Sequence, residues 1–259
     1  MRHRIAAAIV ACAVLAAPAA ADAAPFPNRH QMEAVRQYLK QRGGVVGVGV
    51  IDSQGGVRGV HGTRTFRTAS VIKAMLLVRY LRKVAREDRA LTSEERSQLE
   101  PMIRVSSNDA ATWVYNRLGD RALRRLARRA SMDQFTICCG TWGAARFSAR
   151  DQAKFFWQLE RFTPPRFRDY ATHLLRSIVS SQSWGIPSVG RPRGFSVFFK
   201  GGWGTTTLGA LVHQASFVRY RDTGFSLAVL TDGSPSMNYG ISTIEGVARR
   251  ILRTKPLTR

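Results

Sequence analysis

The spacing of apolar residues predicts a helical middle of the chain between two ends that carry strands. Near the start, Met32, Val35 and Leu39 recur at helical intervals and predict a helix. Apolar runs over 45–52 and 57–60, separated by two glycines, predict a β-hairpin.

The longest amphipathic pattern covers 69–85, where the apolar positions repeat on one face and predict a long helix. The sequence Thr-Ser-Glu-Glu at 92–95 is typical of a capped helix start. Further amphipathic segments cover 109–118, 121–130, 149–159 and 167–180. The middle of the chain is therefore expected to be largely helical.

From residue 195 the pattern changes to that of strands. Strand-like runs cover 195–200, 210–218 and 225–231, with a turn at 222–224 between the last two. An amphipathic helix over 241–251 closes the chain. Strands at both ends that enclose a helical insertion predict an antiparallel sheet completed by both ends of the chain.

The first residues have the pattern of a secretory signal. Arg2 and Arg4 give a basic start, an apolar run covers 5–17, and small residues around 21–23 form a cleavage site. The run is shorter than the roughly 20 residues that a membrane-spanning helix needs. We therefore expect a signal peptide over 1–24, a single domain over 25–259, and a secreted or cell-wall-associated protein.

The net charge of +23 is large for a chain of 259 residues. Two interpretations stay open: retention near an anionic cell-wall polymer or anionic lipid, and solvated faces of an arginine-rich protein. Nucleic-acid binding is not expected, because no recognition motif is present and an exported protein rarely meets nucleic acid.

Only Cys138 and Cys139 remain after cleavage, and adjacent cysteines cannot link distant elements. Two small buried thiols are favoured over a strained vicinal disulfide, because Cys is among the most often buried residue types. His61, His173 and His213 lack a metal-binding spacing. We expect neither a metal nor a cofactor, and a structural role for His213 in its predicted strand.

Ser70 and Lys73 lie three positions apart at the start of the 69–85 segment, on one face of the predicted helix. A serine hydroxyl is a poor nucleophile until a base takes its proton. A lysine can be that base if burial and the helix N-terminus lower its pKa. The pair therefore predicts an activated serine, but it is common enough by chance to need support from its context.

Two later stretches supply that context. Ser106 and Asn108 present a hydroxyl and a carboxamide two positions apart, with a helix cap as the alternative interpretation. A second Ser-x-Asn, at 236–238, is assigned to such a cap. Lys200 ends a strand and is followed by glycines, Gly202 among them, which would let a substrate backbone approach while the lysine holds a carboxylate.

In this order the motifs resemble the S-x-x-K, S-x-N and K-T-G set of serine β-lactamases and penicillin-binding proteins, in particular the class A β-lactamase-like branch. The similarity covers nearly the whole mature chain, including S-S-N-D-A-A-T, F-S-A-R-D and F-K-G-G-W. It implies an α/β (α+β) fold of the β-lactamase/transpeptidase type, an antiparallel sheet flanked by helices plus a reduced all-helical subdomain. The sheet part would cover about 25–68 and 190–259, and the helical part about 69–189.

The resemblance also implies a role for each matched residue. Ser70 would be the acylated nucleophile and Lys73 its base. Ser106 would pass a proton to the leaving nitrogen, and Asn108 would hydrogen-bond the substrate amide. Lys200 would attract a carboxylate of the substrate.

The segment after Lys200 would bind substrate as well. Gly202 and Trp203 are its expected binding residues, with the backbone N–H groups of Ser70 and Trp203 as the oxyanion hole. Trp184, which precedes this strand, fits either a cleft-lining or a packing role.

The chain departs from the family pattern at three points. Gly201 stands where the family has Thr or Ser, so a hydroxyl contact to a substrate carboxylate is missing, unless Thr205 or Thr206 supplies it. The interval from Ser70 to Ser106 is short, which implies a trimmed helical part and a more open cleft. The glutamate that positions the deacylating water in class A enzymes has no counterpart, since Asp133 is the one acid between 131 and 148.

These features together predict an exported serine hydrolase or acyltransferase that forms an acyl-enzyme on Ser70. It would be a D,D-peptidase, amidase or esterase acting on small-molecule or peptidoglycan-derived substrates, with β-lactams as slow acylating ligands. Two alternatives stay open: a class A-like β-lactamase, and a non-catalytic cell-wall-binding protein.

Overall fold

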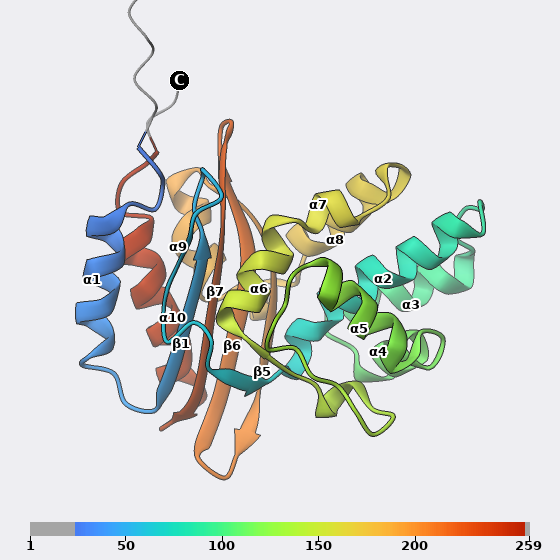
Figure 1. The fold of residues 1–259 in the computed structure, drawn as a ribbon, viewed down its shortest axis with the longest axis horizontal. Helices are drawn as coiled ribbons and strands as arrows, with labels where there is room; N and C mark the ends of the chain where they lie inside the picture. Colours follow the sequence, from blue (N-terminus) through green and yellow to red (C-terminus); the bar gives the residue numbers. More distant parts are fainter. Residues whose placement is uncertain (1–23, 257–259) are drawn as a thin grey trace, which may run out of the picture.

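The computed structural model describes residues 24–256, which form a five-stranded antiparallel sheet with helices on both faces (Figure 1). The predicted signal peptide over 1–24 lies, apart from its last residue, outside the described residues. The strand order is β2-β1-β7-β6-β5, so both ends of the chain build one sheet. Its strands are β1 (Val45–Ile51), β2 (Val57–Val60), β5 (Ser196–Thr206), β6 (Gly209–Tyr220) and β7 (Thr223–Ser234).

Two helices from opposite ends of the chain, α1 (Arg29–Leu39) and α10 (Met237–Ile251), pack together beside one face of the sheet. Helix α6 (Ala149–Trp157) packs against β1 and β7 on the other face. The remaining α-helices are α2 (Lys73–Arg86), α3 (Ser93–Arg104), α4 (Asn108–Asn116), α5 (Gly119–Arg129), α7 (Leu159–Phe162), α8 (Arg168–Arg176) and α9 (Ile186–Gly190). Short 3-10 turns are η1 (Ala69–Ile72), η2 (Trp142–Ala144), η3 (Pro165–Phe167), η4 (Ser180–Gln182) and η5 (Arg191–Arg193).

The predicted fold class is confirmed, and so is the predicted order of helices and strands. Thr92 caps α3 with a reciprocal bond to Glu95, as the 92–95 pattern indicated. Ser236 caps α10 by accepting from Tyr239 N, as assigned. The pattern did not predict the small sheet of β3 (Thr65–Arg67) and β4 (Arg146–Ser148).

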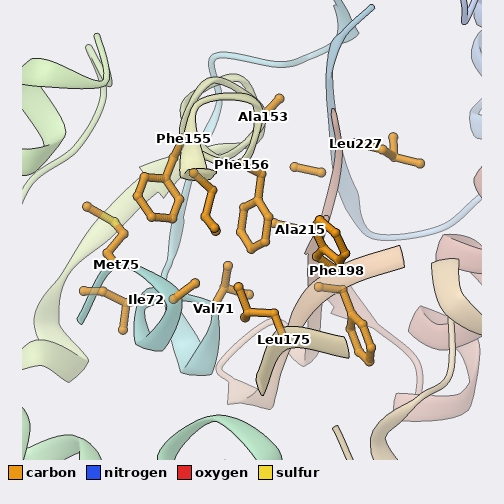
Figure 2. Close-up of a cluster of buried hydrophobic side chains, with 14 of the residues drawn as sticks. Val71, Ile72, Met75, Ala153, Phe155, Phe156, Leu175, Phe198, Ala215 and Leu227 are labelled. Carbon is orange, nitrogen blue, oxygen red and sulfur yellow. The ribbon is translucent and has the colours of Figure 1, made fainter. Parts of the chain in front are cut away.

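A core of buried side chains lies between the start of α2 and α6 (Figure 2). Val71, Ile72 and Met75 are fully buried and face the aromatic rings of Phe155 and Phe156 on α6. Burial of a large apolar side chain stabilises by roughly 1.5–3 kcal/mol. This packing fixes the position of the segment that carries Ser70 and Lys73.

The sequence expectation for the two cysteines was wrong, because Cys138 and Cys139 are both exposed free thiols. They lie in an irregular loop, where Cys139 has a left-handed backbone (φ 68°) and no neighbouring element covers the side chains. His213, in contrast, is buried in β6, where Nδ1 accepts from Thr231 N and Nε2 lies 3.0 Å from the Arg67 carbonyl. Burial lowers its pKa to about 4, which agrees with a neutral structural histidine.

Among residues 24–256, the helices are all too short or too polar to cross a lipid bilayer.

Substitution of Gly49 by alanine should destabilise the fold by about 2 to 3 kcal/mol, because α6 begins against the backbone of β1 at this point. A Cβ on Gly49 would collide with the Ala149 carbonyl. Chemical denaturation of Gly49→Ala and of the control Gly204→Ala measures the effect, since a Cβ on Gly204 meets nothing within 4 Å. Equal stability of the two variants would contradict this packing.

Candidate active site

Ser70 lies in the turn η1, which runs directly into α2 at Lys73. The predicted continuous helix over 69–85 is therefore divided into a 3-10 turn and an α-helix. Ala69 has a left-handed backbone (φ 43°), and Thr68 N donates to the Ala145 carbonyl at 3.0 Å. These constraints hold the Ser70 side chain, which is partly exposed, at the mouth of the site.

Lys73 is completely buried, and its amine makes three hydrogen bonds to the Ser106 segment. Nζ donates to the Ser106 carbonyl at 2.6 Å, to Ser106 Oγ at 3.2 Å and to Asn108 Oδ1 at 2.8 Å. Burial disfavours the charged amine and lowers the pKa of Lys73 to about 8. Lys73 is thus close to the protonation balance that a base needs near neutral pH.

Ser106 and Ser107, in the bend between α3 and α4, make different hydrogen bonds. Ser107 caps α4, because its hydroxyl accepts from Ala110 N at 3.2 Å. Ser106 has a left-handed backbone (φ 61°) that directs its hydroxyl to the two lysines instead. The cap interpretation of the motif therefore applies to Ser107. A non-glycine residue in this conformation is strained, and such strain is often found at functional sites.

Lys200 approaches the same hydroxyl from β5. It is completely buried, and its Nζ donates to Ser106 Oγ at 3.1 Å and to the Gly201 carbonyl at 2.9 Å. Burial, followed by repulsion from Lys73, lowers the pKa of Lys200 to about 7. Within the described residues, no carboxylate pairs with either amine.

The hydrogen bonds of the described chain do not include one from Lys73 to the Ser70 hydroxyl. The structure therefore brings Ser70, Lys73, Ser106, Asn108 and Lys200 into one site, with the Lys73 amine engaged by its Ser106 partners. To accept the Ser70 proton, Lys73 must be neutral, and a neutral amine donates fewer hydrogen bonds.

Gly202 allows β5 to cross the Ser70 turn at close range. A Cβ at this position would lie 2.8 Å from the Ser70 backbone nitrogen and 3.0 Å from that of Val71. Any side chain would therefore push the strand away from the turn. The next residue, Trp203, is consequently close to the Ser70 backbone, as an oxyanion hole built from both N–H groups requires.

Three tryptophans lie near the site, and the sequence analysis identified two of them, Trp184 and Trp203. The centroid of the Trp142 ring lies 5.2 Å from Lys73 Nζ, while Trp142 Nε1 donates to Thr112 Oγ1 at 3.2 Å. The ring of Trp184 lies 3.4 Å from the position of a Cβ on Gly201 and packs edge-to-face with Trp203, with 6.1 Å between the ring centroids. Trp184 therefore has the packing role that the sequence allowed, whereas Trp142 had no local signal in the sequence.

Thr205 and Thr206, the two candidates to replace a hydroxyl at Gly201, differ in the availability of their hydroxyl groups. Thr206 Oγ1 donates to Asp232 Oδ1 at 2.6 Å and is engaged within the sheet end. Thr205 lines a cavity of about 200 Å³ beside Ala69, together with Trp203 and the cationic Arg67. Thr205 is therefore the available hydroxyl of the two.

The loop before β4 contributes no carboxylate to the site. Asp133, its one acid, is mostly exposed and pairs with Lys154 at 2.8 Å. Asp151 is buried, but both of its oxygens accept backbone N–H groups, from Ser148 and Gln134. Across residues 24–256, no three His, Cys, Asp or Glu side chains cluster so as to hold a metal ion.

Comparison with solved structures shows the same fold in several enzymes. A β-lactamase from Sphaerobacter thermophilus is 19% identical, with a TM-score of 0.72, covering 86% of this chain and 96% of that one. A class A β-lactamase from Mycobacterium abscessus is 18% identical (TM-score 0.73, 86% and 98% covered). The protein PBP-A is 19% identical (TM-score 0.73, 87% and 95% covered).

No curated protein sequence matches the chain at a significant level. The family model described as "Beta-lactamase enzyme family" matches residues 30–97 and 96–254, which is most of the chain. This match includes the Ser70, Ser106 and Lys200 segments that the fold brings together. The chain therefore belongs to the beta-lactamase enzyme family and is a serine hydrolase of the β-lactamase and penicillin-binding type.

Proposed function

We propose that this enzyme is exported and forms an acyl-enzyme on Ser70 from cell-wall-related peptides, amides or esters. The observation that carries the proposal is the meeting of Lys73 and Lys200 at Ser106 Oγ, at 3.2 and 3.1 Å, beside the Ser70 turn. This arrangement supplies a base, a proton relay and an anion-binding amine without any carboxylate.

Acylation would begin when neutral Lys73 takes the proton of Ser70 and the Ser70 oxygen attacks the substrate carbonyl. The developing oxyanion would accept from the Ser70 and Trp203 backbone N–H groups. The proton would then pass from Lys73 through the Ser106 hydroxyl to the leaving nitrogen or oxygen, whose bond to the carbonyl carbon breaks. Asn108 would orient the substrate amide by hydrogen-bonding to it. To do so, its carboxamide would give up part of its hydrogen bonding with Lys73.

Hydrolysis of the acyl-enzyme by water should be slow. The family's water-positioning glutamate has no equivalent, because Asp133 is paired with Lys154. Trp142 instead covers Lys73 from the loop side. A long-lived acyl-enzyme favours transfer to an amine or slow hydrolysis, as in a D,D-peptidase, amidase or esterase, and makes β-lactams slowly released ligands.

A class A-like β-lactamase is the second candidate, because the similar solved structures include enzymes of that name as well as PBP-A. The two candidates differ in the lifetime of the penicilloyl adduct. Rapid loss of this adduct, with steady turnover of a chromogenic cephalosporin, would favour the β-lactamase.

The extracytoplasmic location is part of the proposal. It rests on the basic, apolar and small-residue pattern of residues 1–24 and on a net charge of +23, which favours retention at an anionic polymer. Export of the full chain with loss of about 24 residues, measured by mass spectrometry of the secreted protein, tests this location.

A fluorescent penicillin should label the wild-type enzyme covalently, and Ser70→Ala should abolish the label because the attacking oxygen is gone. Ser106→Ala should slow labelling by about 100-fold or more through loss of the proton relay. Ser236→Ala is the matched control, since Ser236 occupies the other Ser-x-Asn and caps α10. Equal labelling of Ser70→Ala and wild type would disprove the assignment of the nucleophile.

The acylation rate with a neutral ester should rise with pH through about 8, because only unprotonated Lys73 accepts the Ser70 proton. With a penicillin, the rate should instead reach a maximum between about pH 7 and 8 and then fall, because Lys200 loses the charge that attracts the carboxylate. The penicillin profile should thus be bell-shaped and the ester profile should not. Rate constants measured between about pH 5 and 10 test both lysines separately. Identical profiles would remove Lys200 from carboxylate binding.

Gly201→Thr should increase acylation by a penicillin about tenfold, because the new hydroxyl can donate to the carboxylate. A Cβ at Gly201 is in ordinary contact with the Trp184 ring, so the strand can accept it. A neutral ester should show little change. Gly204→Thr, which places the same side chain elsewhere on β5, is the control, and an equal gain there would contradict a specific contact at 201.

A further inference from the structure

A second cavity, of about 350 Å³, lies between the C-terminal halves of α2 and α5, in the helical part away from α1 and α10 (Figure 1). Except for Leu126, its lining consists entirely of arginines: Arg79, Arg82 and Arg86 from α2, and Arg125, Arg128 and Arg129 from α5. We refer to these six residues as the arginine cavity. No residue of the Ser70 site lines it.

Arg79 is the innermost member of the arginine cavity. The residue is only 8% exposed, and its Nη1 atom is buried without a hydrogen-bond partner. Burial lowers the pKa of Arg79, and the charges of Arg86 and Arg125 lower it further. A buried guanidinium with an unsatisfied donor is costly unless something binds it, so its presence requires an explanation.

No acidic side chain of the described chain compensates the arginine cavity. The ion pairs on its two helices are Lys83 with Glu87 and Arg124 with Asp120, neither of which includes one of the six arginines. Arg82 donates to the Phe162 carbonyl at 2.9 Å, which is a neutral partner. Positive side chains at helix C-termini gain a little from the helix dipoles, about 0.3–1 kcal/mol each at the surface, which does not satisfy a buried donor.

We infer that the arginine cavity binds an anion that carries at least two phosphoryl groups. The planar guanidinium group matches the oxygens of a phosphoryl group in a bidentate way. One phosphoryl group would satisfy Arg79 at the base, and a second would reach the rows of arginines on both helices. The volume falls within the range of small-ligand sites. The ligand could be a soluble polyphosphorylated molecule or a phospholipid headgroup with more than one phosphate.

Calorimetric titration of the full mature enzyme with inorganic pyrophosphate tests the inference, with sulfate at equal ionic strength as the reference. The rim variant Arg125→Gln/Arg129→Gln should weaken pyrophosphate binding by at least about tenfold, because it removes two donors on exposed side chains. The control Arg29→Gln/Arg253→Gln removes the same charge from exposed positions beside α1 and α10, and should stay within about twofold of wild type.

A second variant separates binding from folding. Arg79→Met should raise the Tm of the ligand-free enzyme by about 2 to 4 °C, because it removes a buried unpaired charge. The same variant should lose the increase in Tm that pyrophosphate gives the wild type. A lower ligand-free Tm together with unchanged pyrophosphate binding would overturn the role of Arg79.

Vesicle sedimentation distinguishes the two sources of the ligand. Vesicles containing cardiolipin, compared with phosphatidylglycerol vesicles of equal charge, test for a headgroup with two phosphates. A preference for cardiolipin that the rim variant loses would support a lipid source, and pyrophosphate binding without that preference would support a soluble one. The inference fails if neither ligand binds better than its reference, or if the control loses as much affinity as the rim variant. Penicillin labelling at Ser70 is a separate readout, so neither outcome decides the acyl-enzyme proposal.

Discussion

The site depends on the enforced proximity of two lysine amines that share one hydroxyl. Lys73 and Lys200 are fully buried, and both donate to Ser106 Oγ without a carboxylate to balance their charge. Burial lowers the pKa of Lys73 to about 8, and burial followed by repulsion from Lys73 lowers the pKa of Lys200 to about 7. The lowered pKa values are therefore a product of the fold, because neither lysine would have them on an exposed surface.

Burial of two neighbouring amines is unfavourable, and packing of the three segments that carry the site holds them in place. The apolar residues after Ser70 lie in the central core beside the rings of α6. The strained backbone of Ser106 is held because Ser107 caps the next helix and donates its N–H to the Pro101 carbonyl. Lys200 is fixed by the pairing of β5 with β6. The three segments of the site are far apart in the sequence, and packing in the domain core holds them together.

Sequence patterns predicted those parts of the molecule that local spacing determines. The amphipathic helices, the hairpin and the cap at Ser236 follow from periodicity and capping chemistry, and the motif order identified the residues that meet in the site. Strand β5 extends beyond its apolar run to Thr206, because its glycines and threonines also pair with β6. Two features could not be predicted: the contact between Trp142 and Lys73, and the arginine cavity. Each forms between segments that are far apart in the chain. The exposed cysteines show the limit of residue-type averages in an irregular loop.

The position of β5 at the margin of the sheet has a further consequence. In the strand order β2-β1-β7-β6-β5, no other strand of the described chain pairs with its outer side. The unpaired backbone donors and acceptors of an edge strand can hydrogen-bond to an added strand and so extend the sheet. Because Gly202 brings this edge against the Ser70 turn, a chain that paired along β5 would also lie beside that turn. Recognition by main-chain pairing selects for extended shape more than for side-chain identity.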